Sequence, residues 1–182
     1  MDNSVVITSA SRTAVGSLGK SLRNISGDRL GSAVISECIS RSKLKKEEID
    51  EVIMGQVLTG GTGQNPARQS AINSGIPKEK PAYIVNQVCG SGIRSIVSGY
   101  QSIKSLDSKI IITGGQESMS LAPHAAHLRD GKKIGDIEMT DTMIKDGLWD
   151  AFNGYHMGIT AENVAEKFQV TREEQDKFAL YS

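Results

Sequence analysis

The sequence has few cysteines, few aromatic residues and no excess of charge of either sign. Of its 182 residues two are cysteines and 4% are aromatic, and 21 Lys and Arg residues balance 21 Asp and Glu residues. Two cysteines are too few for a disulfide framework, so a reducing compartment is the simplest expectation. Without a charge excess or a basic stripe, nucleic acid and membrane surfaces are poor partners. We therefore expect a cytoplasmic protein with neither kind of partner.

Long apolar runs are also missing. No stretch approaches the ~18 apolar residues that a membrane-spanning helix needs. The N-terminal residues lead into Val5, Val6 and Ile7 with neither a basic-then-apolar signal nor an Arg-rich transit segment, so we expect no targeting leader. The chain is instead rich in glycine, with 19 residues, and 38% of it is hydrophobic. This composition is typical of a soluble globular protein with one domain, or one domain plus part of another.

Short aliphatic runs alternate with stretches of helical spacing. The runs lie at residues 5–7, 52–54, 83–85 and 110–112. Each is continuous rather than alternating, as expected for strands that are covered on both faces. Apolar residues recur at helical spacing in residues 30–38 and 93–103, and a shorter helix is expected after Pro66. The alternation predicts an α/β fold, with a mostly parallel sheet in βαβαβαβ order and helices on its faces.

The periodic pattern is lost after residue 115 and returns near residue 161. Residues 116 to 159 hold all three histidines, four of the six methionines and the only tryptophan. An aperiodic segment of this length is rarely a mere connection in a compact domain. Farther on, Thr171 and Glu174 have the spacing of a capping box, which predicts a final helix.

One of the two cysteines has the setting of a nucleophile. Cys89 follows a predicted strand and precedes a predicted helix, with Gly90 and Gly92 beside it. Glycines permit a tight turn and the close approach of a ligand. The N-terminus of a helix favours negative charge, and so the nucleophilic thiolate. A cysteine can also fall at such a junction by chance, but position, glycines and polar flanks together favour a nucleophile. Cys38 lies on an apolar helical stripe and is expected to be a small hydrophobe.

Two other interpretations of the motifs are weaker. Residues 90–95 form a degenerate G-x-G-x-x-[GA] pattern for a dinucleotide, but the predicted strand at 110–112 ends without the acidic residue that such a site needs. His124 and His127 have a spacing that would let two imidazoles face one way on a helix. Pro123 and the lack of a further ligand cluster weigh against a metal there. We therefore expect no metal and no cofactor.

Motifs along the whole chain resemble those of the thiolase family. Residues 86–92, which include Cys89, resemble the family's acyl-enzyme signature. Further matching motifs follow the family's order at residues 10–13 (ASRT), 54–57 (MGQV), 63–69 (GQNPARQ), 114–120 (GGQESMS), 129–131 (RDG), 141–148 (DTMIKDGL) and 155–163 (YHMGITAEN). The closest branch is the biosynthetic one, which condenses two acetyl-CoA into acetoacetyl-CoA. The resemblance implies an acyltransferase in which Cys89 carries the acyl group and the CoA thioester is substrate rather than cofactor.

The resemblance also implies roles for other residues. Leu148, His156 and Met157 match positions that line the family's pantetheine pocket, although ordinary loop packing is the alternative. The backbone N–H of Cys89 would help to hold the developing oxyanion. The charged residues 129–133 fall where family members form a tetramerisation loop, which implies a homotetramer for the full-length enzyme.

The resemblance finally implies that part of the enzyme is missing. Thiolases are about twice as long and have two similar halves, and the second half supplies a Gly-His-Pro histidine, a second cysteine and an asparagine. None of these motifs occurs here. We therefore expect an N-terminal half-domain at residues 1–118, the beginning of an inserted loop domain at 119–182, and little condensation by the chain alone. The alternative is a non-catalytic acyl-CoA-binding or interaction module of the same fold.

Overall fold

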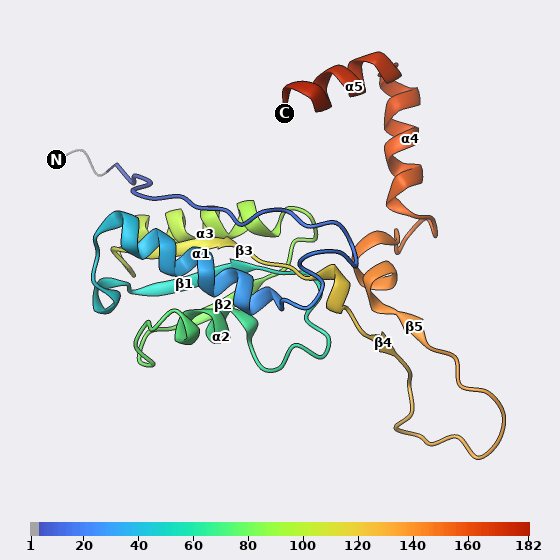
Figure 1. The fold of residues 1–182 in the computed structure, drawn as a ribbon, viewed down its shortest axis with the longest axis horizontal. Coiled ribbons are helices and arrows are strands. Elements are labelled where there is room, and N and C mark those ends of the chain that lie inside the picture. The colour runs from blue at the N-terminus through green and yellow to red at the C-terminus, as the bar shows by residue number, and fades with distance from the viewer. Residues whose placement is uncertain (1–3) are drawn as a thin grey trace.

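The structure, a computed structural model, describes residues 4–182 (Figure 1). Residues 1–3, which belong to the predicted half-domain and to the segment considered for a leader, lie outside the described residues. In chain order the first elements are α1 (Gly27–Ser42), β1 (Glu51–Gly55), α2 (Pro66–Asn73), β2 (Ala82–Val85), α3 (Ser91–Lys104) and β3 (Ile111–Gly115). The predicted alternation of strands and helices is therefore confirmed over this part of the chain.

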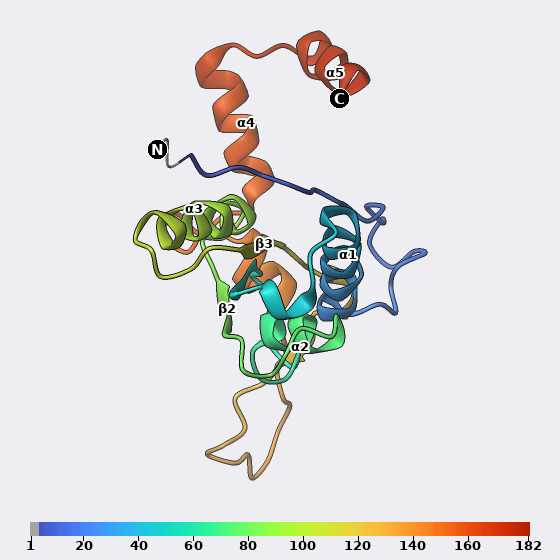
Figure 2. The same cartoon turned by 90° about the vertical axis from the view of Figure 1, so that its left-hand side faces the viewer.

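These elements form three layers, with a parallel sheet of order β2-β1-β3 in the middle and helices on each side of it. Val52 of the central strand pairs with Ala82 on one side and with Ile112 on the other. Helix α3 covers one face of the sheet, and α1 and α2 pack together on the other, as Figure 2 shows. The predicted α/β class, with a parallel sheet and helices on its faces, is confirmed.

The predicted strand at Val5, Val6 and Ile7 is not formed, so the observed order begins with α1. Val6 and Ile7 are 70% and 79% exposed. A cavity of about 290 Å³ lies among this segment, α1, α3 and β3, which is one of the two edge strands of the described sheet. An aliphatic run becomes a strand only where its backbone groups find a ladder partner, and in this structure the segment lies across the cavity from β3.

The core lies between the sheet and the α1–α2 pair. Val52 and Met54 of β1 pack there with a cluster of buried residues from both helices and the adjoining segments, namely Ile35, Ile39, Ile49, Ala67, Ala71 and Ile76. Ile53, between them, is also fully buried. Since neighbouring side chains of a strand point to opposite faces, Ile53 is buried under α3. The continuous aliphatic run of β1 thus predicted its burial on both faces correctly.

Helix α3 packs on the sheet through its small residues and exposes its large apolar ones. Its buried residues are Ser91, Ser95 and Gly99, four residues apart. A Cβ on Gly99 would lie 2.6 Å from the Thr113 methyl carbon, so only glycine allows this approach. The apolar stripe that predicted the helix faces outward, since Ile93 remains 72% exposed. The outer side of α3 is therefore an exposed apolar surface.

After β3 the chain leaves the sheet. Its elements are a 3-10 turn (Met119–Leu121), β4 (His124–Ala125), β5 (Thr140–Asp141), a π-helical segment (Met143–Leu148), α4 (Met157–Phe168) and α5 (Arg172–Tyr181). Strands β4 and β5 pair antiparallel, and α4 and α5 stand away from the sheet (Figure 1). The final helix is confirmed with its capping box, since Glu174 N donates to Thr171 Oγ1 at 3.2 Å and Thr171 N to Glu174 Oε2 at 2.8 Å.

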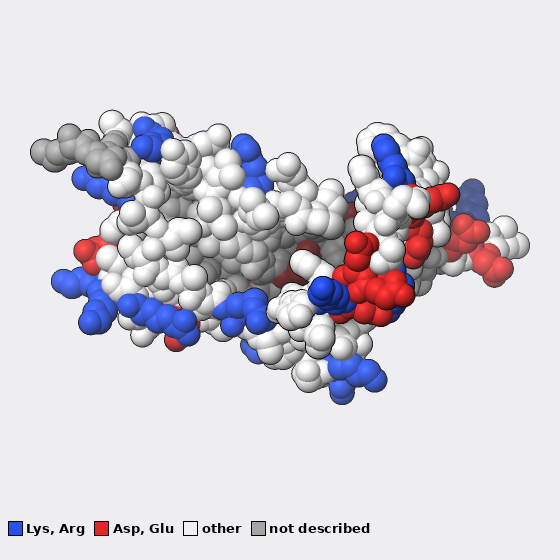
Figure 3. All heavy atoms as spheres, turned by 90° about the horizontal axis from the view of Figure 1, so that it is seen from above, with Lys and Arg blue, Asp and Glu red and all other residues white. Residues whose placement is uncertain are grey.

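Acidic side chains gather at the end of the molecule where α4 and α5 stand, as the space-filling view of Figure 3 shows. Within residues 4–182, the structure has no helix that is both long and apolar enough to cross a membrane.

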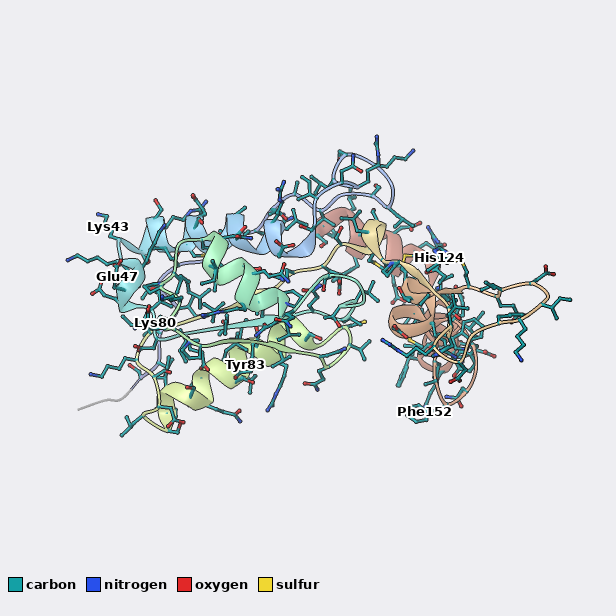
Figure 4. All side chains as sticks on the ribbon, turned by 90° about the horizontal axis from the view of Figure 1, so that it is seen from below. Lys43, Glu47, Lys80, Tyr83, His124 and Phe152 are labelled. Carbon is teal, nitrogen blue, oxygen red and sulfur yellow. The ribbon has the colours of Figure 1, made fainter. Side chains whose placement is uncertain are left out.

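Asp50, the residue before β1, forms hydrogen bonds to the backbone just before β3. Its Oδ2 accepts the N–H groups of Lys109 at 2.8 Å and Ile110 at 3.0 Å. These bonds, with the Lys80 ammonium 3.8 Å away, hold the pKa of the Asp50 carboxyl below its usual value of 3.8 against the opposing effect of burial. Figure 4 shows Lys80 at the end of the sheet away from His124.

The Asp50→Ala variant is expected to unfold more easily at neutral pH, by about 1 kcal/mol for a partly exposed carboxylate. Because the folded-state pKa is lowered, this contribution is fully present above 3.8 and is lost as the pH falls through the folded pKa. Urea titrations at pH 7 and near pH 3 measure the difference. A gap between wild type and variant that widens on acidification would contradict this origin.

Gly55, the last residue of β1, allows the first turn of α3 to approach the sheet. A Cβ there would lie 2.4 Å from the carbonyl carbon of Ser91 and 2.6 Å from Gly92 N. Gly55→Ala is therefore expected to cost about 2 kcal/mol of stability, because backbone on both sides must shift. The midpoint of urea unfolding measures this cost.

Gly114→Ala is the matched control for this variant. A Cβ on Gly114 of the neighbouring strand would meet only the end of the Met54 side chain, at 3.6 Å. Its stability should equal or slightly exceed that of the wild type, because alanine restricts the unfolded chain. Equal effects of the two substitutions would refute the close approach of β1 and α3.

Candidate functional site

The segments that follow the three parallel strands meet at one edge of the sheet and line one cavity of about 440 Å³. The lining includes residues 55–58, Val88, Cys89, residues 115–117, Gly147 and Leu148. The carboxyl edge of a parallel sheet is where open α/β folds bind their ligands. The cavity is therefore the candidate site.

The turn that carries Cys89 is closed by its own hydrogen bonds. Gly90 N donates to Gln87 O at 3.0 Å and Ser91 N to Val88 O at 3.1 Å. The Ser91 hydroxyl accepts from Gln87 N at 2.9 Å and donates to Val88 O at 2.5 Å. Val88 has a φ of 49°, in the left-handed region that β-branched residues rarely adopt. Strain of this kind persists where the surrounding structure enforces it, and it clusters at functional sites.

Cys89 is a free, exposed cysteine on this turn. The next residue, Gly90, is the N-cap of α3, so the thiol lies at the end of the helix that favours negative charge. The side chain therefore faces the cavity from a fixed turn and is open to a reagent. Cys38 lies elsewhere, half-buried on α1, with its Sγ 3.1 Å from Ser11 Oγ.

Buried polar side chains support the strand ends behind the cavity. Gln116 Nε2 donates to Gln56 Oε1 at 2.9 Å, and the hydroxyl of Ser70 donates to Gln116 Oε1 at 2.6 Å. Gln56 Nε2 in turn donates to Leu58 O at 3.1 Å. Sequence reasoning did not assign these residues a role. The available signals were that Gln56 and Gln116 are polar residues shortly after predicted buried strands, and that they lie in the matching motifs at residues 54–57 and 114–120.

Of the three residues predicted to line the pantetheine pocket, one borders the cavity of Cys89. Leu148 lines the same cavity as Cys89, whereas His156 and Met157 are not among its lining residues. His156 is the N-cap of α4, and its Nδ1 accepts from Gly158 N at 3.0 Å. Met157 is the half-buried first residue of that helix. The assignment of the three residues to a CoA site stays a prediction.

The two other histidines do not share a helix face. His124 lies in β4 with its Nε2 3.9 Å from Asp141 Oδ2, and His127 follows the strand. Within the described range, no group of three or more His, Cys, Asp or Glu residues is placed to hold a metal. The charged residues 129–133 lie in the exposed connection between β4 and β5, and their role in a tetramer stays a prediction.

Comparison with known proteins covers almost the whole chain. The family profile described as "Thiolase, N-terminal domain" matches residues 5–182. An acetyl-CoA acetyltransferase of Rhizobium meliloti (strain 1021) is 59% identical over 98% of this chain and 46% of that protein. A protein of Rattus norvegicus named "Acetyl-CoA acetyltransferase, cytosolic" is 52% identical over 98% of this chain and 45% of that protein.

A solved structure has the same fold. It is the Acat5 thiolase of Ascaris suum in complex with coenzyme A, with a TM-score of 0.89 and 37% identity over 96% of this chain and 45% of that chain. The chain thus spans about half the length of the relatives it matches. Since the profile extends continuously over the sheet, the Cys89 turn and the segment beyond, the chain belongs to the thiolase family and carries its N-terminal domain.

Proposed function

We propose that the polypeptide carrying this chain is a thiolase-type acyltransferase that condenses two acetyl-CoA into acetoacetyl-CoA, or catalyses the thiolytic reverse. The observation that carries the proposal is the exposed Cys89 thiol, which borders a cavity at the carboxyl edge of the sheet and directly precedes α3. The printed names of the relatives support the acetyl-CoA substrate, and the solved relative was crystallised with coenzyme A. A cytoplasmic location stays a prediction.

In the first half-reaction the Cys89 thiolate attacks the carbonyl carbon of acetyl-CoA. A carbon–sulfur bond forms to Cys89, the bond to the CoA sulfur breaks, and CoA leaves as a thiolate that takes up a proton. The product is an acetyl-cysteine thioester, which divides one difficult step into two easier ones. The backbone N–H of Cys89 is the donor of this turn proposed to help hold the negative charge on the carbonyl oxygen during the attack, since the N–H groups of Gly90 and Ser91 close the turn itself.

The second half-reaction needs a base that the described residues do not supply at the cavity. A second acetyl-CoA must lose a methyl proton, and its carbon then attacks the acetyl group and releases the Cys89 thiolate. Among the described residues that line the cavity, Glu117 is the only titratable group besides Cys89. Its Oε2 already accepts two backbone N–H groups. We therefore assign the base to the part of the enzyme that lies outside this chain.

Incubation of the 182-residue chain with acetyl-CoA is expected to add one acetyl group, at Cys89. Intact-mass measurement followed by peptide mapping locates it. Cys89→Ala should abolish the modification, whereas the matched control Cys38→Ala should keep it, because Cys38 is half-buried on α1. Acetylation of both cysteines alike, or of neither, would contradict the assignment of the nucleophile.

The same incubation should release little or no acetoacetyl-CoA, since the base for the second step is missing. An enzymatic assay for the product measures this. Steady turnover by the chain alone would contradict the placing of the base outside it. If Cys89→Ala binds acetyl-CoA as well as the wild type does and neither protein is acetylated, the chain is instead a non-catalytic acyl-CoA-binding module.

A further inference from the structure

The carboxylate of Glu117, which lines the cavity, accepts hydrogen bonds from two backbone N–H groups. Glu117 lies two residues beyond β3, and its Oε2 accepts the N–H groups of Val57 at 2.9 Å and Leu58 at 3.3 Å. Its other oxygen, Oε1, is buried and has no hydrogen-bond partner within the described structure. Burying part of a carboxylate costs free energy. The reason why a carboxylate is buried here therefore lies in the two backbone N–H groups that Glu117 binds.

Glu117 fixes the chain that leaves β1. Val57 and Leu58 follow that strand, and the carbonyl of Leu58 also accepts Gln56 Nε2 at 3.1 Å. The segment is thus held at its N–H groups by a carboxylate and at its carbonyl by an amide. Hydrogen bonds to a charged group are the stronger kind, so the carboxylate is the main fastening. Leu58 itself is only 7% exposed, so its side chain is packed against its surroundings.

Leu58 connects the sheet edge to the segment that carries Leu148. A Cβ built on Gly147 would lie 3.5 Å from Leu58 Cδ2, so the Leu58 side chain borders the space that a larger side chain at Gly147 would enter. Gly147 and Leu148 end the π-helical segment Met143–Leu148, and both line the cavity that Cys89 borders. Leu58 is therefore the neighbour of this part of the wall on the side of β1.

We propose that Glu117 is a positioning residue for the reaction at Cys89. By holding the backbone of Val57 and Leu58 it fixes the Leu58 side chain, and through Leu58 it sets the width of the cavity that admits the acyl thioester and its pantetheine arm. This inference rests on the proposed function, because it requires that an acyl-CoA reach Cys89 through this cavity. Glu117 acts through Leu58 and does not touch the reacting atoms.

Two reagents of different size separate this role from a direct effect on the thiol. Iodoacetamide is small and reports the reactivity of Cys89 itself. Bromoacetyl-CoA carries the pantetheine arm, and Cys89 displaces its bromide to form a thioether. Both rates can be measured on the 182-residue chain, with the site read by peptide mass spectrometry so that Cys38 is scored separately.

Glu117→Ala is expected to lower the second-order rate constant with bromoacetyl-CoA by about tenfold, the size of effect expected for losing a hydrogen bond to a charged group. The loss should appear as a higher reagent concentration for half-maximal rate, while the iodoacetamide rate stays unchanged. Glu117→Gln should recover most of the loss, because the amide oxygen still accepts the two N–H groups without carrying charge.

Leu58→Ala tests the same connection without touching the carboxylate. It should reproduce the loss with bromoacetyl-CoA, and the double variant Glu117→Ala/Leu58→Ala should be no worse than Leu58→Ala alone, since both substitutions act on one contact. The matched control is Glu47→Ala, an exposed glutamate at the opposite end of the sheet (Figure 4), which should leave both rates unchanged.

Three results would overturn the inference. The first is an unchanged bromoacetyl-CoA rate in a folded Glu117→Ala. The second is an equal slowing of both reagents in Glu117→Gln, which would mean that the charge acts on the thiol directly. The third, decisive even if Glu117→Ala fails to fold, is an unchanged bromoacetyl-CoA rate in Leu58→Ala. If the wild-type chain gives no saturable reaction with bromoacetyl-CoA at Cys89, the proposed function itself fails.

Discussion

The site depends on the close contact between the first turns of α3 and the strand ends beneath them. That contact is possible because the residues on both sides carry little or no side chain. Gly55 has no room for a Cβ beside Ser91, and Gly92 lies within 3.5 Å of the Cβ position of Gly115. The hydroxyl of Ser95 fastens the same contact by donating to Gly114 O at 2.8 Å. Because the start of α3 is fixed in this way, the preceding turn presents Cys89 at the sheet edge.

A second layer of interactions shapes the space in front of that turn. The residues directly after β3 hold the residues directly after β1, through the Gln116–Gln56 pair and through Glu117. These groups are buried or half-buried, so each hydrogen bond forms in a medium that strengthens it. Two kinds of interaction thus shape the carboxyl edge of the sheet. Close backbone packing positions Cys89, and hydrogen bonds between buried polar groups position the cavity wall.

Local pattern was enough to predict most of the fold and the position of Cys89. The aliphatic run of β1, the spacing of α1 and α3, and the capping box at Thr171 each correspond to the element they predicted. The run at residues 5–7 failed because a strand needs a neighbour, and periodicity says nothing of whether one is within reach. The apolar stripe of α3 likewise faces away from the sheet. Helical spacing identifies the helix, but it does not tell which face of the helix packs on the sheet.

The rest of the site could not be predicted from local pattern, because it is made by contacts between distant segments. Glu117 and Leu58 are 59 positions apart, and no periodicity links them. Family motifs placed Leu148, His156 and Met157 on the pantetheine pocket, yet only Leu148 lines the cavity of Cys89 in this chain. His156 is used locally as the N-cap of α4, a role that depends on where that helix begins.

The most direct test of the central claim is a crystal structure of the chain after soaking with acetyl-CoA. The account predicts an acetyl group bonded to Cys89 Sγ, with its carbonyl oxygen turned toward the backbone N–H of Cys89. It also predicts that the space between Leu58 and Leu148 is occupied whenever coenzyme A is retained. An unmodified Cys89 with the coenzyme bound away from this edge of the sheet would contradict it.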